Sequence, residues 1–160
     1  MPKSNPYHVH LNDATYSFST DYGLHYACDF YDITPLLPPV VGIYDIQVLD
    51  FEFSSSGKHR HDPRVGDTIC HLIRQTFDDK ERAVLFMCDN SDNKGKARHK
   101  TFQKWSNDLM ITRQDMEIKA GDQVVLGSIL TRKDFPYPDV LQREVIGPVK
   151  DFAIQKFGGQ

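Results

Sequence analysis

The sequence feature that most constrains the fold is an unbroken apolar run followed by a polar loop and a basic helical pattern. Residues 83–88, Ala-Val-Leu-Phe-Met-Cys, are all apolar, which is typical of a strand that is covered on both faces and therefore central in a sheet. Residues 89–93 are Asp, Asn or Ser only. Such a loop places carboxylates, amides and free backbone N–H groups between a strand end and a helix start, where anions, substrates and partners bind.

The other segments predict an α+β domain with a mixed, mainly antiparallel sheet in the order β-β-β-α-β-α-β-β-α. A change of apolar parity near Leu49 and Asp50 predicts a β-bulge in the third strand. The prolines at 35, 38 and 39 predict an irregular loop before that strand. The predicted strands cover residues 15–19, 24–31, 43–53, 83–88, 112–119 and 123–130, and the predicted helices begin at Asp62, near Asp92 or Asn93, and at Asp139, with a break at Gly147-Pro148.

Length and composition indicate one domain and argue against several classes of protein. In a chain of 160 residues we expect a flexible leader over residues 1–14 and a single domain over residues 15–160. No segment approaches the ~20 apolar residues of a membrane span, and residues 1–6 lack the apolar core of a secretory signal. The net charge of −3 argues against nucleic acid as a partner. Three scattered cysteines without a CxxC motif predict buried thiols in a cytoplasmic protein.

The candidate ligand-binding site draws on two helix starts. Asp, Asn and Ser are also the residues of turns and helix caps, so residues 89–93 have a purely structural alternative. We expect Arg98 to fold back and pair with Asp89 or Asp92 in a bidentate contact. The predicted ligand-binding residues are Asp89, Asn90, Asp92, Asn93, Arg98, Arg64 and Gly66.

The remaining polar and aromatic side chains predict no catalytic set and no metal site. His59 and His61 lack the ligand spacing of a known metal centre. Trp105 falls on the apolar stripe of its helix with Phe102, so we expect it to pack in the core. The basic residues of the same helix are expected to form a solvated surface.

A short motif carries a resemblance to a known family. The segment Cys88-Asp89-Asn90-Ser91-Asp92, followed by Ala97-Arg98, Phe102 and Trp105, resembles the hallmark of an uncharacterised bacterial family of about this length. The resemblance covers residues 15–145. It implies kinship and no known activity.

The order of elements is also similar to that of the GNAT acetyltransferases over their C-terminal two-thirds. In that family, the loop after a three-strand meander cradles the pyrophosphate of acetyl-CoA with backbone N–H groups. The corresponding loop here is residues 57–68, where Gly66 matches the family pattern and Pro63 and Thr68 depart from it. Fold-level analogy by itself is weak support for function.

Three functional hypotheses follow, of which the weakest is a nucleic-acid-acting protein that uses the basic helix after residue 93. The first is a binding module that uses residues 89–98 together with residues 57–68 and needs no cofactor. Its partner is a small ligand, another protein or a second copy of the same chain. The second is a divergent GNAT-like acyltransferase that uses acetyl-CoA, for which a diverging pair of central strands is expected.

Overall fold

The computed structural model describes residues 4–58, 61–90, 92–107 and 111–158. Its centre is a seven-stranded sheet in the order β1-β2-β3-β4-β5-β7-β6. Neighbouring strands are antiparallel except β4 and β5, which are parallel. The predicted α+β class and mainly antiparallel sheet are therefore confirmed. The strands are β1 (His10–Asn12), β2 (Thr15–Ser19), β3 (His25–Asp32), β4 (Gln47–Ser55), β5 (Arg82–Cys88), β6 (Ile111–Ala120) and β7 (Gln123–Arg132).

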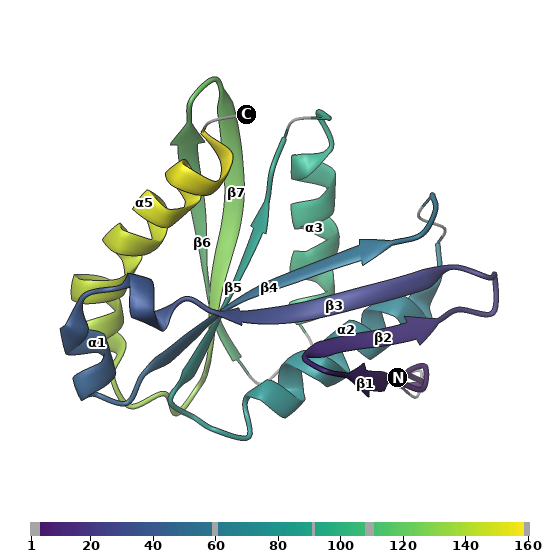
Figure 1. Cartoon of the computed structure of the whole chain (residues 1–160), viewed down its shortest axis with the longest axis horizontal. Coiled ribbons are helices and arrows are strands. Elements are labelled where there is room, and N and C mark those ends of the chain that lie inside the picture. The colour runs from purple at the N-terminus through teal and green to yellow at the C-terminus, as the bar shows by residue number, and fades with distance from the viewer. Residues whose placement is uncertain (1–3, 59–60, 91, 108–110, 159–160) are drawn as a thin grey trace.

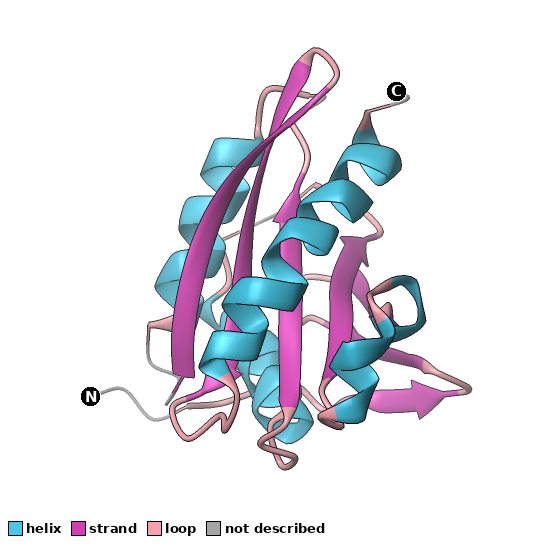
Figure 2. Ribbon diagram, turned by 90° about the vertical axis from the view of Figure 1, so that its left-hand side faces the viewer, coloured by secondary structure: helices cyan, strands magenta, loops and turns pink. Residues whose placement is uncertain are grey.

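Helices cover both faces of the sheet (Figures 1 and 2). Two cores form because successive side chains of β5 point to opposite faces of the sheet. Val84 and Phe86 lie in one core, and Ala83 and Leu85 lie in the other. The first core contains α2 and α3, and the second contains α1 and α5. The helical elements are the 3₁₀ turn η1 (Thr34–Leu36), α1 (Pro39–Ile43), α2 (Pro63–Thr76), α3 (Gly95–Ser106), α4 (Pro138–Val140), the π-helical turn η2 (Leu141–Val145) and α5 (Ile146–Phe157).

The start of α2 is confirmed as predicted. The Asp62 carboxylate accepts a hydrogen bond from the Arg64 backbone N–H at 3.0 Å, and Pro63 occupies the first turn. A proline fits there because the first N–H groups of a helix have no partner within the helix.

The predicted third strand is wrong at its start and in its bulge. Residues 39–43 form α1, with Pro39 in the first turn, and the chain then reverses at Asp45, which has a φ of 58°. The β3–β4 register runs without a break from Tyr26↔Ser55 to Asp32↔Leu49. The change of apolar parity has another cause, since β4 is covered on both faces and therefore buries consecutive residues.

The N-terminal segment contains structure that the predicted leader did not include. β1 pairs with β2, so the sheet begins at His10 rather than Thr15. Tyr7 is buried, and its hydroxyl donates to the Asp62 carboxylate at 2.6 Å. This segment therefore lies against the start of α2.

Two helix boundaries also differ from the prediction. α3 begins at Gly95 rather than near Asp92 or Asn93. The break expected at Gly147-Pro148 takes the form of the π-helical turn η2, which leads into the first turn of α5. Proline has no N–H for the helical ladder, and the wider turn accommodates that loss. No helix in the described part of the chain has the length and apolar character that a membrane span requires.

Candidate functional site

The two parallel strands at the centre of the sheet separate along their length. Pairing runs from Gln47↔Arg82 to Phe51↔Phe86 and stops there. Beyond this point β4 continues to Ser55 beside β3, and β5 continues to Cys88 beside β7 (Figure 1). In the described part of the chain, the facing edges of the two strands therefore have no ladder between them, which leaves room for a ligand there.

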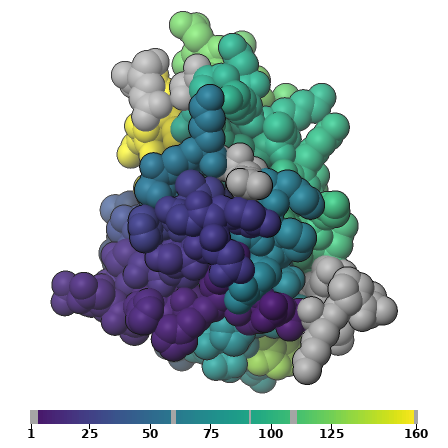
Figure 3. Space-filling view, turned by 90° about the vertical axis from the view of Figure 1, so that its right-hand side faces the viewer, coloured from purple at the N-terminus to yellow at the C-terminus, as the bar shows by residue number. Residues whose placement is uncertain are grey.

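A cavity of about 920 Å³, hereafter the cleft, opens between these edges. Ligand sites in proteins are concave, largely apolar spaces of this order of size. α3 forms one wall, and the end of α5 contributes Lys156 and Phe157. Figure 3 shows the end of α5 (yellow) against blue residues from the region of β4, in agreement with the Lys156–Glu52 contact. Three predicted site residues line the cleft: Asp89, Asp92 and Arg98.

Aromatic rings form the apolar wall of the cleft. Phe53 lies nearly parallel to Phe86 with ring centroids 5.9 Å apart, and it is 6.1 Å from the ring of Trp105. Behind this wall, Phe102 is fully buried and stacks on Phe86 at 3.9 Å. Trp105 is only half-buried. The expectation of a core tryptophan is therefore corrected, because the indole packs on the core with one side and faces the cleft with the other.

Charged side chains surround the apolar wall. Arg98 forms the expected bidentate pair with Asp92, in which one Nη1–Oδ1 distance is 3.1 Å. This hydrogen bond holds the pKa of the Asp92 carboxyl below its usual value. Lys58 and Lys94 also line the cleft, and neither forms an ion pair with another described residue.

The loop between β5 and α3 is held mainly by its own hydrogen bonds. The Asn90 side-chain oxygen accepts from the Gly95 N–H at 3.1 Å, and the Asn90 carbonyl accepts from the Asn93 N–H at 3.0 Å. Asn93 has a φ of 61°, which its short polar side chain tolerates. A Cβ on Gly95 would collide with the Asp89 carbonyl. Asn90 and Asn93 therefore shape the loop, and neither lines the cleft.

The predicted residues at the start of α2 lie apart from the lining of the cleft. The Arg64 guanidinium pairs with Asp21 at 3.0 Å and lies 3.8 Å from the centre of the Tyr7 ring. Gly66 is buried, and a Cβ there would collide with the indole of Trp105. Arg64 thus anchors the N-terminal segment, and Gly66 allows the tryptophan to lie close to α2. His59 and Arg60 of the same loop, like Ser91 of the motif, fall outside the described residues.

An ion-pair cluster closes the cleft on the α5 face of the sheet. The Lys156 ammonium contacts the Glu52 carboxylate and lies 2.8 Å from Asp50 Oδ2. Asp50 is buried, and its second oxygen, Oδ1, has no hydrogen-bond partner among the described residues. Burial raises the pKa of this carboxyl, and Lys156 opposes the rise.

Cys88 lines the cleft with a neutral thiol. Burial raises the pKa of this group to about 12, so the nucleophilic thiolate is absent near neutral pH. The cleft therefore offers hydrogen bonds, ion pairs and aromatic contacts, and no activated cysteine.

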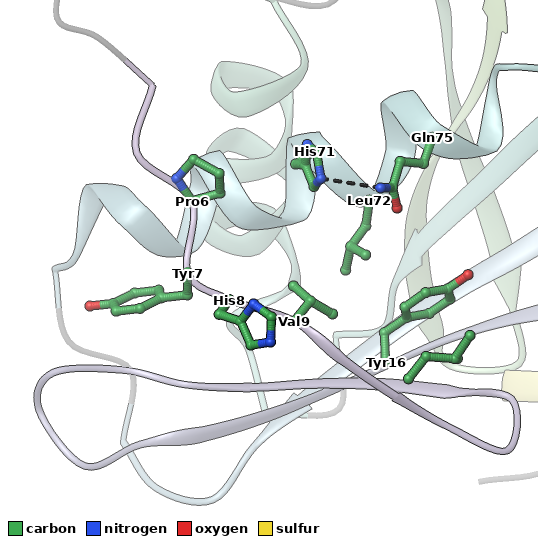
Figure 4. Close-up of a pocket in the computed structure, with 9 residues that line it drawn as sticks. Pro6, Tyr7, His8, Val9, Tyr16, His71, Leu72 and Gln75 are labelled. Carbon is green, nitrogen blue, oxygen red and sulfur yellow. Dashed lines mark hydrogen bonds between the residues drawn. The ribbon is translucent and has the colours of Figure 1, made fainter.

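A second, smaller cavity of about 340 Å³ lies beside the N-terminal segment (Figure 4). His71, Leu72 and Gln75 on α2 line one side of it, and Tyr7 and Tyr16 line another. Side-chain nitrogens of His71 and Gln75 are 3.2 Å apart. This cavity contains none of the predicted site residues.

Comparison with known proteins assigns the chain to a family. The model of a family of unknown function, DUF6169, matches residues 61–142, which is 82 of the 160 residues. The chain belongs to this family. The matched segment contains α2, β5, α3, β6 and β7, so the DUF6169 region includes the 89–98 loop, whereas β4 and α5 lie outside it. The predicted resemblance to a family without a known function is therefore confirmed.

No curated protein matches the sequence. Among solved structures, the chain is similar to a CoA-dependent acyl-homoserine lactone synthase, MesI, with a TM-score of 0.38 and 11% sequence identity. The similarity covers 90% of this chain and 70% of the synthase.

Several residues of the cleft carry no signal in the sequence. Glu52 and Lys156 are separated by more than a hundred positions, and only the fold brings them together. Phe53 and Phe86 belong to apolar runs that predict core packing equally well. The divergence of β4 from β5 makes these side chains part of a site, and no local pattern encodes that divergence.

Proposed function

We propose that this DUF6169 protein is a binding module for a small molecule with an apolar body and an anionic end, and that the molecule binds in the cleft between β4 and β5. The separation of the two strands beyond Phe51 and Phe86 is the observation that carries the proposal. It opens a space of ligand size that is walled by aromatic rings and edged by strand backbone outside the β4–β5 ladder.

The charges around the cleft support an anionic end on the ligand. Arg98 and Lys156 are already paired with carboxylates. Lys58 and Lys94 are the lining cations without an ion pair in the described part of the chain. A carboxylate, sulfonate or phosphate at the rim would gain attraction from both ammonium groups without breaking an existing pair.

Trp105 provides a direct test, because it is the single tryptophan of the chain and lines the cleft. Octanoate is a suitable probe, with octanol and octylamine as uncharged and cationic controls of equal chain length. We expect saturable changes in tryptophan fluorescence with octanoate, a weaker response to octanol and the weakest to octylamine. An equal response to all three, or none to octanoate, contradicts the proposal.

A matched pair of variants distinguishes binding in the cleft from binding elsewhere on α3. Ala97 lines the cleft and is exposed, so Ala97→Phe should fill the space without disturbing the core and should abolish octanoate binding. Lys96→Phe adds the same ring at the adjacent exposed position, which does not line the cleft, and should leave binding within about twofold of the native protein.

A second candidate is acyl transfer from acetyl-CoA, and the diverging parallel strands favour it because this hypothesis requires them. The start of α2 fits a pyrophosphate less well. Pro63 has no N–H, and the Asp62 carboxylate already accepts from the Arg64 N–H, so a negative charge occupies the place where a phosphate would bind. Millimolar acetyl-CoA should raise the melting temperature if this candidate is correct and leave it unchanged if the cleft serves only an apolar anion.

A further inference from the structure

The two walls of the cleft are joined by a chain of contacts across the end of α5. On the β4 side, Lys156 pairs with Asp50 and Glu52. On the β5 side, the side chain of Gln123 donates to the Phe157 carbonyl at 3.0 Å and accepts from the Asn90 N–H at 3.0 Å. These contacts lie where β4 and β5 no longer pair with each other.

Gln123 satisfies two backbone groups that would otherwise need other partners. The Phe157 carbonyl belongs to the last turn of α5, where the carbonyl oxygens receive no hydrogen bond from an N–H group of the same helix. The Asn90 N–H follows the end of β5 and lies outside the β5–β7 ladder. A half-buried side-chain amide is suited to both tasks, because it carries a donor and an acceptor on one rigid group.

The hold on Asn90 extends to the start of α3. Asn90 accepts hydrogen bonds from the Asn93 N–H through its carbonyl and from the Gly95 N–H through its side chain. Gln123 therefore fixes Asn90, the residue to which both Asn93 and Gly95 are hydrogen-bonded. Asp89, which precedes Asn90, and Asp92, which pairs with Arg98, both line the cleft.

The turn between β6 and β7 keeps Gln123 in register with α5. Gly121 has a φ of 62°, and a Cβ at this position would lie 3.0 Å from the Gly158 carbonyl oxygen. A glycine therefore allows the hairpin to lie against the end of α5. Gln123 begins β7 two residues later.

We infer that Gln123 is a positioning residue of the cleft, which ties Asn90 to the last turn of α5 and, together with Lys156, fixes the separation of the β4 and β5 ends. The effect on a ligand rests on the proposed function. The tie between the two walls is a property of the ligand-free protein, and it is tested separately.

Hydrogen exchange of the Asn90 amide and of the amides in the last turn of α5 tests the tie in the ligand-free protein. Gln123→Leu removes both hydrogen bonds with little change in volume, and we expect exchange at Asn90 to become roughly tenfold faster and exchange at the end of α5 to rise as well. Gln123→Glu keeps an acceptor for Asn90 and loses the donor to Phe157, so it should restore protection at Asn90 and leave the end of α5 as in Gln123→Leu. Gln155→Leu, at an exposed position of α5, is the matched control and should exchange like the native protein. Unchanged exchange at Asn90 in Gln123→Leu overturns the inference.

Octanoate affinity then distinguishes the inference from the proposed function. If the native protein binds octanoate, Gln123→Leu should weaken binding about tenfold while protection of the β3–β4 ladder stays native. Native affinity in this variant overturns the positioning role, even if Asn90 exchanges faster. If the native protein binds no octanoate, the proposed function fails, and the exchange of Asn90 and of the last turn of α5 still decides whether Gln123 ties the two walls.

Discussion

The β4–α2 and β5–α3 junctions both follow a central parallel strand and begin a helix, yet only one of them is open. At the start of α2 the Asp62 carboxylate is buried and receives hydrogen bonds from the Arg64 N–H and the Tyr7 hydroxyl. At the start of α3 the Asp92 carboxylate is exposed, accepts from the Lys94 N–H at 3.1 Å, and pairs with Arg98 beside the cleft.

The difference lies in what covers each junction. The N-terminal segment lies over the start of α2, where Tyr7 is buried and Arg64 is tied to Asp21. No described segment occupies the equivalent place over the 89–98 loop, because the cleft lies there. A carboxylate that accepts a backbone hydrogen bond therefore serves the fold at one junction and borders a candidate ligand site at the other.

The largest effect is expected behind the aromatic wall. Phe102→Ala should lower the free energy of unfolding by about 3–5 kcal/mol, since it removes a fully buried ring stacked on Phe86. Trp105→Ala should cost roughly half as much, because one side of the indole faces the cleft. Chemical denaturation of both variants measures the difference. Equal losses of unfolding free energy would show that Trp105 is a core residue and that its indole does not face the cleft.

The Asp62 and Asp92 carboxylates provide a comparison of the two junctions. Asp62→Ala removes a helix cap and a buried hydrogen bond to Tyr7, so it should cost about 2–3 kcal/mol. Asp92→Ala removes the corresponding group at the exposed junction and should leave the melting temperature within experimental error. A strongly destabilised Asp92→Ala protein would mean that both junctions are structural.

A titratable group is predicted to make the α3 side sensitive to acid. His99 on α3 is buried 2.9 Å from Ser128 Oγ, and that hydroxyl donates to Asp115, which also contacts Arg113 and Gln103. Burial lowers the pKa of His99. Folding therefore favours the neutral imidazole. Its contribution to the free energy of unfolding is fully present above the unfolded-state pKa of ~6.5, and it is lost as the pH falls through the lower pKa of the folded state.

Denaturation at pH 7 and pH 5 measures this effect. The native protein should lose stability at the lower pH, and His99→Gln should lose less. His71→Gln, on the exposed face of α2, should follow the native protein. If His99→Gln and the native protein respond alike, the buried imidazole does not set the acid response.

The smallest effect on stability is expected at the 89–98 loop itself. Asp89→Ala together with Arg98→Ala should change octanoate binding and leave the melting temperature nearly unchanged, because Arg98 and Asp92 are both exposed. Unfolding of either single variant would assign a structural role to the loop and remove it from the site.

Much of the fold could be predicted from local patterns. The apolar run of β5, the Asp62-Pro63 start of α2 and the hairpin of β6 and β7 each depend on neighbouring residues, and the structure confirms all three. The predicted start of β4 is wrong because the sequence does not distinguish a proline in the first turn of a helix from a proline in a loop. The predicted bulge was wrong because burial on both faces hides the alternation of a strand.

The candidate site was predictable only in part. Local order placed Asp89, Asp92 and Arg98 at one junction, and all three line the cleft. Arg64 and Gly66 belong to the predicted site through the resemblance of residues 57–68 to the GNAT pyrophosphate loop, and neither residue lines the cleft. The partners that separate the two junctions, Tyr7 over α2 and Lys156 beside β4, come from the two ends of the chain, so no spacing in the sequence indicates them.

Backbone NMR shifts during titration with octanoate test the site most directly. Binding in the cleft predicts saturable shifts for the amides of residues 52–55 and 87–89 and for the indole N–H of Trp105, with little change at residues 7–9. Shifts confined to residues 7–9, 71, 72 and 75, which line the smaller cavity, or no shifts at all, would contradict the assignment of the cleft as the ligand site.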